Sequence, residues 1–184
     1  MIITITGDAG AGKSTLGEML AEKLNFERYY MGQILRDLAK KKGMTLVELL
    51  KYGESHSEID NELDDYQKHL GEEKENFIIE GRTSWFLIPH SIKLYIKVDP
   101  KVGAERIFED LQHENKRNEG SNLNTVEDVM NSNRKRRESD DLRYKKYYDK
   151  DCFDENNFDL VVDTTEMTPE EVLNKILEFV ESKK

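Results

Sequence analysis

The chain has 184 residues, a length that suits one domain with a substantial core and is short for two. Its 38 acidic and 28 basic side chains give a formal net charge of −10, which argues against a general binder of nucleic acids or anionic membranes. The one cysteine excludes an intramolecular disulfide and fits a reducing compartment. No apolar run approaches the roughly 18 residues of a membrane helix, and the first residues have no signal-peptide pattern. We therefore expect one soluble, cytoplasmic domain spanning residues 1–184, and a monomer.

The first half of the chain predicts strands that alternate with helices. Residues 2–6 are a β-branched run that ends at a glycine, which is typical of a buried strand. A glycine-rich turn and an amphipathic helix follow, and then a short strand at 27–31 and a helix at about 33–42. Thr45 and Glu48 form a capping box for the first of two further helices, which together reach about residue 71. The next strand is predicted at residues 77–80.

The second half continues the alternation. A strand at 92–98 is closed by Asp99-Pro100, a helix follows, and the polar stretch 112–124 has no periodicity. Thr125 then caps a long charged helix, residues 158–163 form the last strand, and Thr168 opens a C-terminal helix. This alternation predicts an α/β fold of three layers, in which helices cover both faces of a central parallel sheet of about five strands. The segments at about 45–71 and 112–124 are expected to project from it as two excursions.

Residues 7–14, GDAGAGKS, match the pattern G-x-x-x-x-G-K-[ST] of a phosphate-binding P-loop. Glycines let successive backbone N–H groups turn toward one phosphate, and the helix that follows directs the positive end of its dipole at the same anion. Lys13 is expected to reach the β- and γ-phosphates, and the Ser14 hydroxyl to be a ligand of Mg²⁺. The motif predicts a nucleoside triphosphate site but not the use of the phosphate. The residues expected to bind the nucleotide here are Gly7, Asp8, Ala9, Gly10, Ala11, Gly12, Lys13, Ser14 and Thr15.

The predicted strand at 77–80 ends in a carboxylate, and an arginine follows two residues later. Ligands of open parallel sheets bind at the carboxyl ends of the strands. Glu80 is therefore expected to hold Mg²⁺ through water, and Arg82 to pair with the phosphate of an acceptor molecule. The alternative is an ordinary surface turn. Trp85 and Phe86, just beyond, fit an acceptor pocket and core packing equally well.

Seven basic residues gather at 134–137 and 143–146 in this acidic chain. On a helix, Arg136 and Arg143 share a face, as do Arg134 and Arg137. Arginines directed at a phosphoryl group in transfer lower the barrier, and we expect two or three of these side chains to face the nucleotide. The others are expected to form solvated pairs with Glu138, Asp140 and Asp141.

Five segments resemble, in this order, the archaeal-type cytidylate kinases, which are P-loop nucleoside monophosphate kinases. They are MIITITGDAGAGKST, MGQILRDLAKKKGMTLVELLKYGE, IIEGRTSWF, RRESDDLRYKKYY and FDLVVDTTEMTPEEV, and they span nearly the whole chain. The resemblance implies that Arg36 and Arg82, with Gly81 between strand and arginine, contact the monophosphate. It also implies that the segment 45–71 is the acceptor-binding excursion and that 112–124 is a lid. Arg137 and Arg143 would clamp the transferring group, and Thr164 would lie near the adenine of ATP.

The resemblance therefore implies phosphorylation of CMP or dCMP with ATP and Mg²⁺, with Lys13, Arg137 and Arg143 as catalytic residues. The first alternative is an AMP kinase or another small-molecule kinase of the same fold. The second, from a different class, is a nucleotide-controlled switch or assembly factor with slow turnover. A switch does not need an acceptor-phosphate site, which Arg36 and Arg82 would supply.

Overall fold

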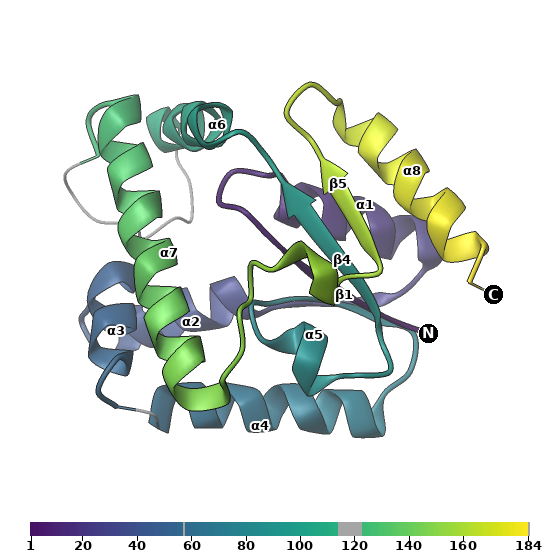
Figure 1. Ribbon diagram of the computed structural model, residues 1–184, viewed down its shortest axis with the longest axis horizontal. Coiled ribbons are helices and arrows are strands. Elements are labelled where there is room, and N and C mark those ends of the chain that lie inside the picture. Colours follow the sequence, from purple (N-terminus) through teal and green to yellow (C-terminus); the bar gives the residue numbers. More distant parts are fainter. Residues whose placement is uncertain (57, 114–122, 184) are drawn as a thin grey trace.

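Five parallel strands form the central sheet in the computed structural model, which describes residues 1–56, 58–113 and 123–183 (Figure 1). Their order across the sheet is β2-β3-β1-β4-β5. The predicted α/β class and all five predicted strands are confirmed, each end to within two residues. The strands are β1 (Ile2–Gly7), β2 (Glu27–Tyr30), β3 (Phe77–Glu80), β4 (Ile92–Lys97) and β5 (Leu160–Asp163).

Eight α-helices are found within the described residues. The capping box predicted at Thr45 begins one of them, and Thr168, predicted to open the last helix, also forms a capping box, with Glu171. Thr125 also caps its helix, with Asp128 as the second residue of the box. The short α5 was not predicted, because one helical turn leaves no periodicity to detect. None of the described helices is long and apolar enough to cross a membrane. The helices are α1 (Lys13–Leu24), α2 (Met31–Lys41), α3 (Leu46–Gly53), α4 (Glu58–Glu73), α5 (Ser84–Leu87), α6 (Pro100–Gln112), α7 (Val126–Tyr148) and α8 (Pro169–Glu181).

Both faces of the sheet are buried, as expected for parallel strands joined by helical crossovers. Because side chains alternate along a strand, Ile3 and Ile5 pack with α1 and α8, whereas Ile2 packs on the opposite face with residues of α2 and α4. Figure 1 shows α1 and α8 together on one side of the strands and α4 and α5 away from them. The sheet is thus the middle of the three predicted layers.

The order of the strands places the ends of β1 and β3 next to each other. From β1 the chain crosses toward the β2 edge of the sheet, and from β3 it crosses toward the β5 edge. A crevice therefore opens between the carboxyl ends of β1 and β3. In the register, Ile5 of β1 is the partner of Glu80 of β3. Beyond it, the Gly81 N–H donates to the carbonyl of Ile5 at 3.1 Å, and the Thr6 hydroxyl donates to the carbonyl of Gly81 at 2.7 Å. The P-loop and the Glu80-Gly81-Arg82 segment therefore start from one rigid edge.

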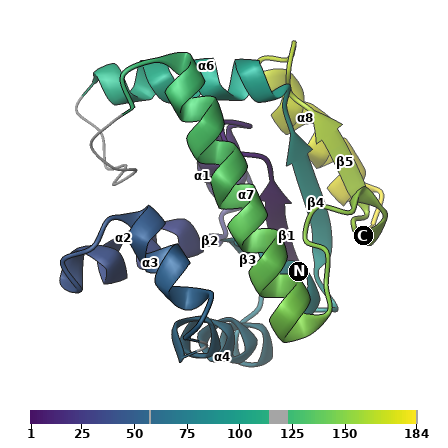
Figure 2. The ribbon, with the colours of Figure 1, turned by 60° about the vertical axis from the view of Figure 1, so that its left-hand side comes forward.

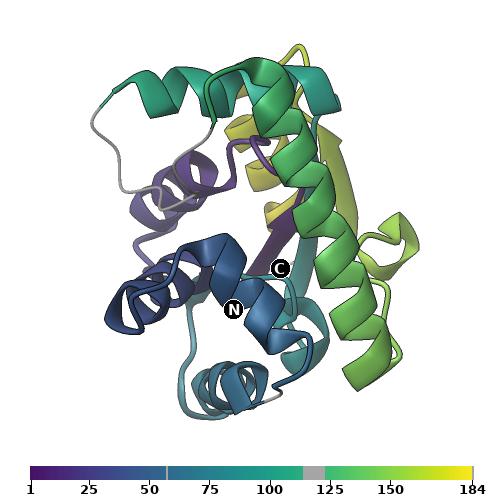
Figure 3. The same cartoon turned by 90° about the vertical axis from the view of Figure 1, so that its left-hand side faces the viewer.

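Helices α3 and α4 correspond to the excursion predicted at 45–71, and α4 ends two residues beyond it. Figures 2 and 3 show α7 passing in front of the strands from α6 to the end of α4. Its last turn is tied to this excursion, since the Tyr147 hydroxyl donates to the carbonyl of Glu54 at 3.1 Å and the Tyr148 hydroxyl donates to Asp64. Of the predicted lid at 112–124, residues 114–122 lie outside the described residues.

Helix α6 meets the P-loop at Gly103, where a β-carbon would lie 2.6 Å from the carbonyl oxygen of Ala9. Alanine is normally the better helix residue by about 1 kcal/mol. We nevertheless expect Gly103→Ala to lower the free energy of unfolding by about 1–3 kcal/mol, because the loop or the helix must shift. Urea denaturation measures this change. The control is Lys101→Ala on the exposed side of the same helix, for which we expect a change within about 0.5 kcal/mol. A higher denaturation midpoint for Gly103→Ala would contradict this close contact.

Candidate active site

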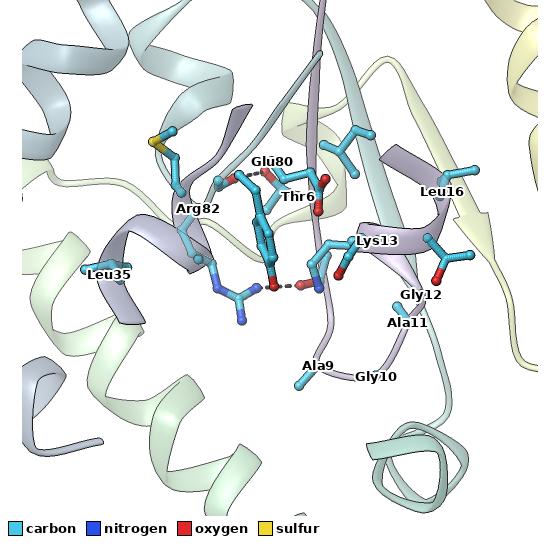
Figure 4. Close-up of a pocket in the computed structure, with 18 of the residues that line it drawn as sticks. Thr6, Ala9, Gly10, Ala11, Gly12, Lys13, Leu16, Leu35, Glu80 and Arg82 are labelled. Carbon is cyan, nitrogen blue, oxygen red and sulfur yellow. Dashed lines mark hydrogen bonds between the residues drawn. The ribbon is translucent and has the colours of Figure 1, made fainter. Parts of the chain in front are cut away.

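A cavity of about 420 Å³ lies at the carboxyl edge of the sheet, a size suited to a small-molecule ligand (Figure 4). Residues from β1, β3 and most of the helices contribute to its lining. Most of the predicted site residues are among them, but Asp8, Arg137 and Arg143 are not. The predicted residues that line the cavity are Gly7, Ala9, Gly10, Ala11, Gly12, Lys13, Ser14, Thr15, Arg36, Glu80, Gly81, Arg82 and Thr164.

The N-terminus of α1 is built to receive an anion. Within the described chain, α1 has neither a side-chain cap nor an acidic residue in its first turn, whereas α3, α7 and α8 each begin with a capping box. The N–H groups of a first helical turn need acceptors from outside the helix. Gly10 and Gly12 have φ values of +78° and +82°, in the left-handed region that glycine adopts without strain. The P-loop therefore leaves the positive end of the helix dipole to a phosphate.

Lys13 directs its ammonium group into this site, where Nζ donates to the backbone carbonyl of Asp8. Burial and the positive charge of Arg82 lower the pKa of Lys13 to about 7, against the opposing effect of Asp8. In Figure 4, Ala9 and Gly10 lie on the turn of the loop beyond Lys13, and the Arg82 side chain reaches toward the strand that leads into the loop. An anion placed against the ammonium would raise this pKa again, because it stabilises the charged form. The site thus favours a ligand that carries several negative charges.

Glu80 is buried at the end of β3, with 2% of its surface exposed. Its Oε1 accepts a hydrogen bond from Nε of Arg28 at 2.6 Å, whereas Oε2 has no hydrogen-bond partner among the described residues. Burial raises the pKa of Glu80 to about 7, and Arg28 opposes this rise. The sequence analysis did not identify Arg28 as a partner of Glu80. The only available indication was a charged residue within a short predicted strand.

The residues around Glu80 fit a magnesium ion. A buried carboxylate oxygen needs a donor or a cation, and Ser14 lines the same cavity. No group of three or more His, Cys, Asp or Glu side chains suited to a metal occurs in the described part of the chain. Mg²⁺ in nucleotide sites is held by one or two protein groups together with phosphates and water, so Ser14 and Glu80 are sufficient.

Two further arginines, Arg36 and Arg82, line the cavity. Arg36 is 6% exposed, and its Nη1 donates to the hydroxyl of Tyr30 at 3.1 Å. Arg82 donates from Nε to Oδ2 of Asp140 at 3.1 Å and from Nη1 to the carbonyl of Gly7. Arg82 therefore stands at the first residue of the P-loop, near Lys13, and Arg36 adds a second buried guanidinium from α2.

Helix α4 contributes a buried polar row that sequence reasoning missed. Asp60, Asp64 and Gln67 are each at most 5% exposed and line the cavity. Gln67 Nε2 donates to the hydroxyl of Thr83 at 3.0 Å, and this hydroxyl donates to Asp64 at 3.2 Å. The spacing i, i+4, i+7 of these polar residues was the available signal, since it puts all three on one helical face.

The basic residues of α7 lie in different surroundings, and not all of the predicted arginines line the main cavity. Arg136 lines the cavity. Arg137 instead lines an adjoining cavity of about 340 Å³, where its Nη1 donates to Oδ1 of Asp8 at 3.2 Å. Its guanidinium also lies over the ring of Phe153, 4.1 Å from the ring centre. One predicted arginine thus faces the main cavity, and a second stands at the P-loop next to it.

Arg143, which was predicted to clamp the transferring group, does not line the cavity in this structure. The side chain is 1% exposed and lies between two carboxylates, 2.9 Å from Oδ1 of Asp140 and 3.3 Å from Oδ2 of Asp60. Burial raises the pKa of Asp60 to about 6 despite the nearby guanidinium. Asp140, which was predicted to be solvated, is 2% exposed and contacts both Arg82 and Arg143. Arg143 and Asp140 are therefore interior charges, and the pair of Arg143 with Asp60 joins α7 to α4.

Thr164 connects the end of β5 to the P-loop. Its hydroxyl lies 3.1 Å from the carbonyl oxygen of Lys97 and 3.3 Å from that of Ala11. Arg106 of α6, which lines the cavity and was missed, donates from Nη2 to the carbonyl of Thr164 at 2.8 Å. The amphipathic pattern of α6 gave no reason to single out this arginine.

Trp85 and Phe86, which fitted either a pocket or the core, belong to the core. Trp85 is 6% exposed and its ring packs against those of Phe86 and Phe158. Phe86 packs in turn against Tyr148 of α7. This aromatic layer packs against α7 at Tyr148, and neither Trp85 nor Phe86 lines the cavity.

Comparisons with known proteins agree with the architecture of the site. Residues 2–166 match the cytidylate kinase-like family. The cytidylate kinases of Archaeoglobus fulgidus and Methanocaldococcus jannaschii are 36% and 37% identical to the chain, over 100% of it and over 97% and 99% of their own lengths. The solved structure of a shikimate kinase from Bacteroides thetaiotaomicron covers 98% of both chains with a TM-score of 0.65 and 18% identity. An uncharacterized protein from Eubacterium ventriosum covers 99% of both with a TM-score of 0.70 and 18% identity. These two structures confirm the fold.

The pKa of Lys13 predicts that phosphate binding takes up a proton. At pH 8 a group with a pKa of about 7 is mostly neutral, and a bound triphosphate that raises this pKa restores the charge. Affinity for ATP should therefore fall as pH rises above 7, by up to about 10-fold per pH unit. Calorimetry with MgATP at pH 8, in buffers of different ionisation enthalpy, should give nearly one proton taken up, and almost none from Lys13 at pH 6.

Lys13→Met is the control for this measurement. Glu80, with a pKa of about 7, is already mostly ionised at pH 8 and adds little. The variant should therefore bind MgATP more weakly and without proton uptake. Equal uptake by the variant and the original chain would show that another group takes up the proton.

Proposed function

Since the chain belongs to the cytidylate kinase-like family, we propose that it transfers the γ-phosphoryl group of ATP to CMP or dCMP. The observation that carries the proposal is one cavity in which two further cations, Arg36 and Arg82, accompany the P-loop and Lys13. The N-terminus of α1 with Lys13 is suited to the donor, and Arg36 with Arg82 is suited to the phosphate of an acceptor. Such a cavity brings two phosphates together, which is the main task in phosphoryl transfer.

The donor side supports ATP with its phosphates along the P-loop. The free N–H groups of the first turn of α1 and the ammonium of Lys13 would bind the β- and γ-phosphates. Mg²⁺, held by Ser14 and through water by Glu80, would neutralise charge on these phosphates when bound. We place the adenine beside Thr164 and Arg106, which line the same cavity beyond the P-loop.

The acceptor side supports a monophosphate. An arginine offers a planar set of donors that matches phosphate oxygens, and Arg36 is held in place by its own burial and by Tyr30. The attacking atom is an oxygen of the monophosphate, which is largely ionised near neutral pH. No general base is therefore required. The bond from γ-phosphorus to the bridging oxygen of ATP breaks as the new P–O bond forms.

Arg136 and Arg137 are proposed to stabilise the charge on the transferring group, together with Lys13. Arg136 lines the cavity, and Arg137 stands at the P-loop beside it. For Arg143 we propose a supporting role, since it is buried between Asp60 and Asp140. By this assignment it holds α4 against α7 and contacts Asp140, the residue that binds Arg82.

Two alternatives are separated by one experiment. Purified protein with MgATP and a panel of CMP, dCMP, UMP, AMP and GMP is assayed for ADP formation. We expect CMP and dCMP to be phosphorylated with the highest kcat/KM. A preference for AMP would instead identify an adenylate kinase of the same fold, and ADP formation with none of the five would favour a switch. Arg36 in the cavity lining speaks against a switch, which needs no acceptor-phosphate site.

Arg36→Ala should mainly weaken the binding of the monophosphate. Loss of a charge-assisted contact corresponds to a KM for CMP that is about 10- to 100-fold higher. The KM for ATP should stay within about 2-fold, because Lys13 and the N-terminus of α1, and not Arg36, are proposed to hold the phosphates of ATP. Lys40→Ala, an exposed cation of the same helix, is the matched control and should change neither KM. Arg82→Ala should likewise weaken CMP. Equal losses for ATP and CMP in Arg36→Ala would place Arg36 outside the acceptor site.

A further inference from the structure

The second residue of the P-loop, Asp8, makes contacts that phosphate binding does not explain. Its carboxylate lines the cavity of about 340 Å³ beside the nucleotide cavity, together with Arg137 and Phe153. Three donors converge on it. The Tyr95 hydroxyl donates to Oδ1 at 2.8 Å, the Val98 N–H donates to Oδ2 at 3.2 Å, and Nη1 of Arg137 donates to Oδ1 at 3.2 Å.

Two of these donors belong to the rigid sheet. Tyr95 is a residue of β4 with 2% of its surface exposed, and Val98 immediately follows that strand. Burial and the Asp8 carboxylate raise the pKa of Tyr95, so its hydroxyl stays protonated and continues to donate. The carboxylate of Asp8 is therefore fixed by the core before Arg137 is considered.

The third donor is on the surface. The side chain of Arg137 is 49% exposed on α7, and a long exposed arginine has many rotamers. Its guanidinium is confined on one side by the ring of Phe153 and at its end by Asp8. Asp8 thus selects one position for a side chain that would otherwise be mobile.

The selected position is next to the proposed phosphate site. Four residues line both cavities, among them Ala9 of the P-loop and Arg136 of α7. A guanidinium carries five N–H donors, so its bond to Asp8 leaves others for a phosphate oxygen. The backbone carbonyl of Asp8 also accepts a hydrogen bond from Lys13. One residue therefore contacts two of the cations assigned to phosphoryl transfer.

We propose that Asp8 is a positioning residue for phosphoryl transfer, whose carboxylate holds Arg137 at the P-loop beside the transferring group. The proposal rests on the proposed function, in which Arg137 stabilises that group. A donor that is already in place needs no reorganisation when charge develops, and this lowers the barrier more than it strengthens substrate binding. Loss of the carboxylate should therefore affect kcat more than either KM.

The test is a double-mutant cycle of Asp8→Asn and Arg137→Ala, with kcat and both KM values measured for MgATP and CMP. Asparagine keeps the shape of the side chain. Its one oxygen can accept from the Val98 N–H while its NH2 group donates to the Tyr95 hydroxyl, so the substitution removes the acceptor of Arg137 and keeps both contacts with the sheet. Thermal unfolding reports whether the variant folds. Asp8→Asn alone should lower kcat about 10-fold and leave both KM values within about 3-fold. In the Arg137→Ala background, the same substitution should have no further effect on kcat.

Other outcomes are distinct. If Asp8→Asn lowers kcat by the same factor in both backgrounds, Asp8 only anchors the loop to β4, and the proposal is overturned. If Arg137→Ala leaves kcat unchanged, Arg137 has no part in transfer and the Asp8 proposal fails while CMP phosphorylation stands. If the unmodified protein phosphorylates none of the monophosphates, the proposed function itself fails. Lys135→Ala, an exposed cation of the same helix, is the control and should show no coupling to Asp8→Asn.

Discussion

Two phosphate-bearing molecules repel each other, and a site that joins them must gather positive charge within a protein whose net charge is −10. The fold does this with cations from separate elements, which meet only because β1 and β3 end side by side. Lys13 begins α1, Arg36 is on α2, Arg82 follows β3 and Arg136 is on α7. The cost appears at Lys13, where burial and Arg82 bring the pKa down to about 7. Repulsion among these cations destabilises the protein without ligand. A polyanion bound between them removes this repulsion, so the same charges strengthen ligand binding.

The acidic residues near the site counterbalance these cations. Asp140 binds Arg82 and Arg143, and Asp60 lies against Arg143 from the other helix. Buried ion pairs contribute little net stability, because both partners lose their hydration, but an unpaired partner would be very costly. The arrangement therefore sets positions: an arginine with a carboxylate on one side presents its remaining donors in one direction. Asp8 has the same relation to Arg137, and Glu80 is held in a similar way by Arg28.

Local features of this molecule were accessible from the sequence, and partners distant in the chain were not. The strand before the P-loop, the Thr45 and Thr168 capping boxes and the Glu80-Gly81-Arg82 turn depend on neighbouring residues, and the structure has each of them. Helical periodicity correctly puts Arg136 and Arg143 near one face of α7. It does not say that the second half of this face is covered by α4, which buries Arg143 against Asp60, 83 positions away in the sequence. The spacing of the polar residues on α4 predicts that they share one helical face. The sequence does not tell whether this face meets solvent, the core or the cavity.

Helix α7 couples the residues proposed to hold the acceptor to the arginines proposed to stabilise the transferring phosphoryl group. Its second half is fixed to the segment of α3 and α4, where the Ser139 hydroxyl donates to Glu54 at 2.6 Å and the Tyr148 hydroxyl donates to Asp64. Its first half carries Arg136 over the cavity and Arg137 at the P-loop. An α-helix is stiff over 23 residues. A displacement of Tyr148 relative to α4 therefore also moves Arg136 and Arg137. Helix α7 thus links the groups that would hold the acceptor to the arginines that would stabilise the transferring phosphoryl group. The ion pairs of Arg143 lie where α7 packs against α4.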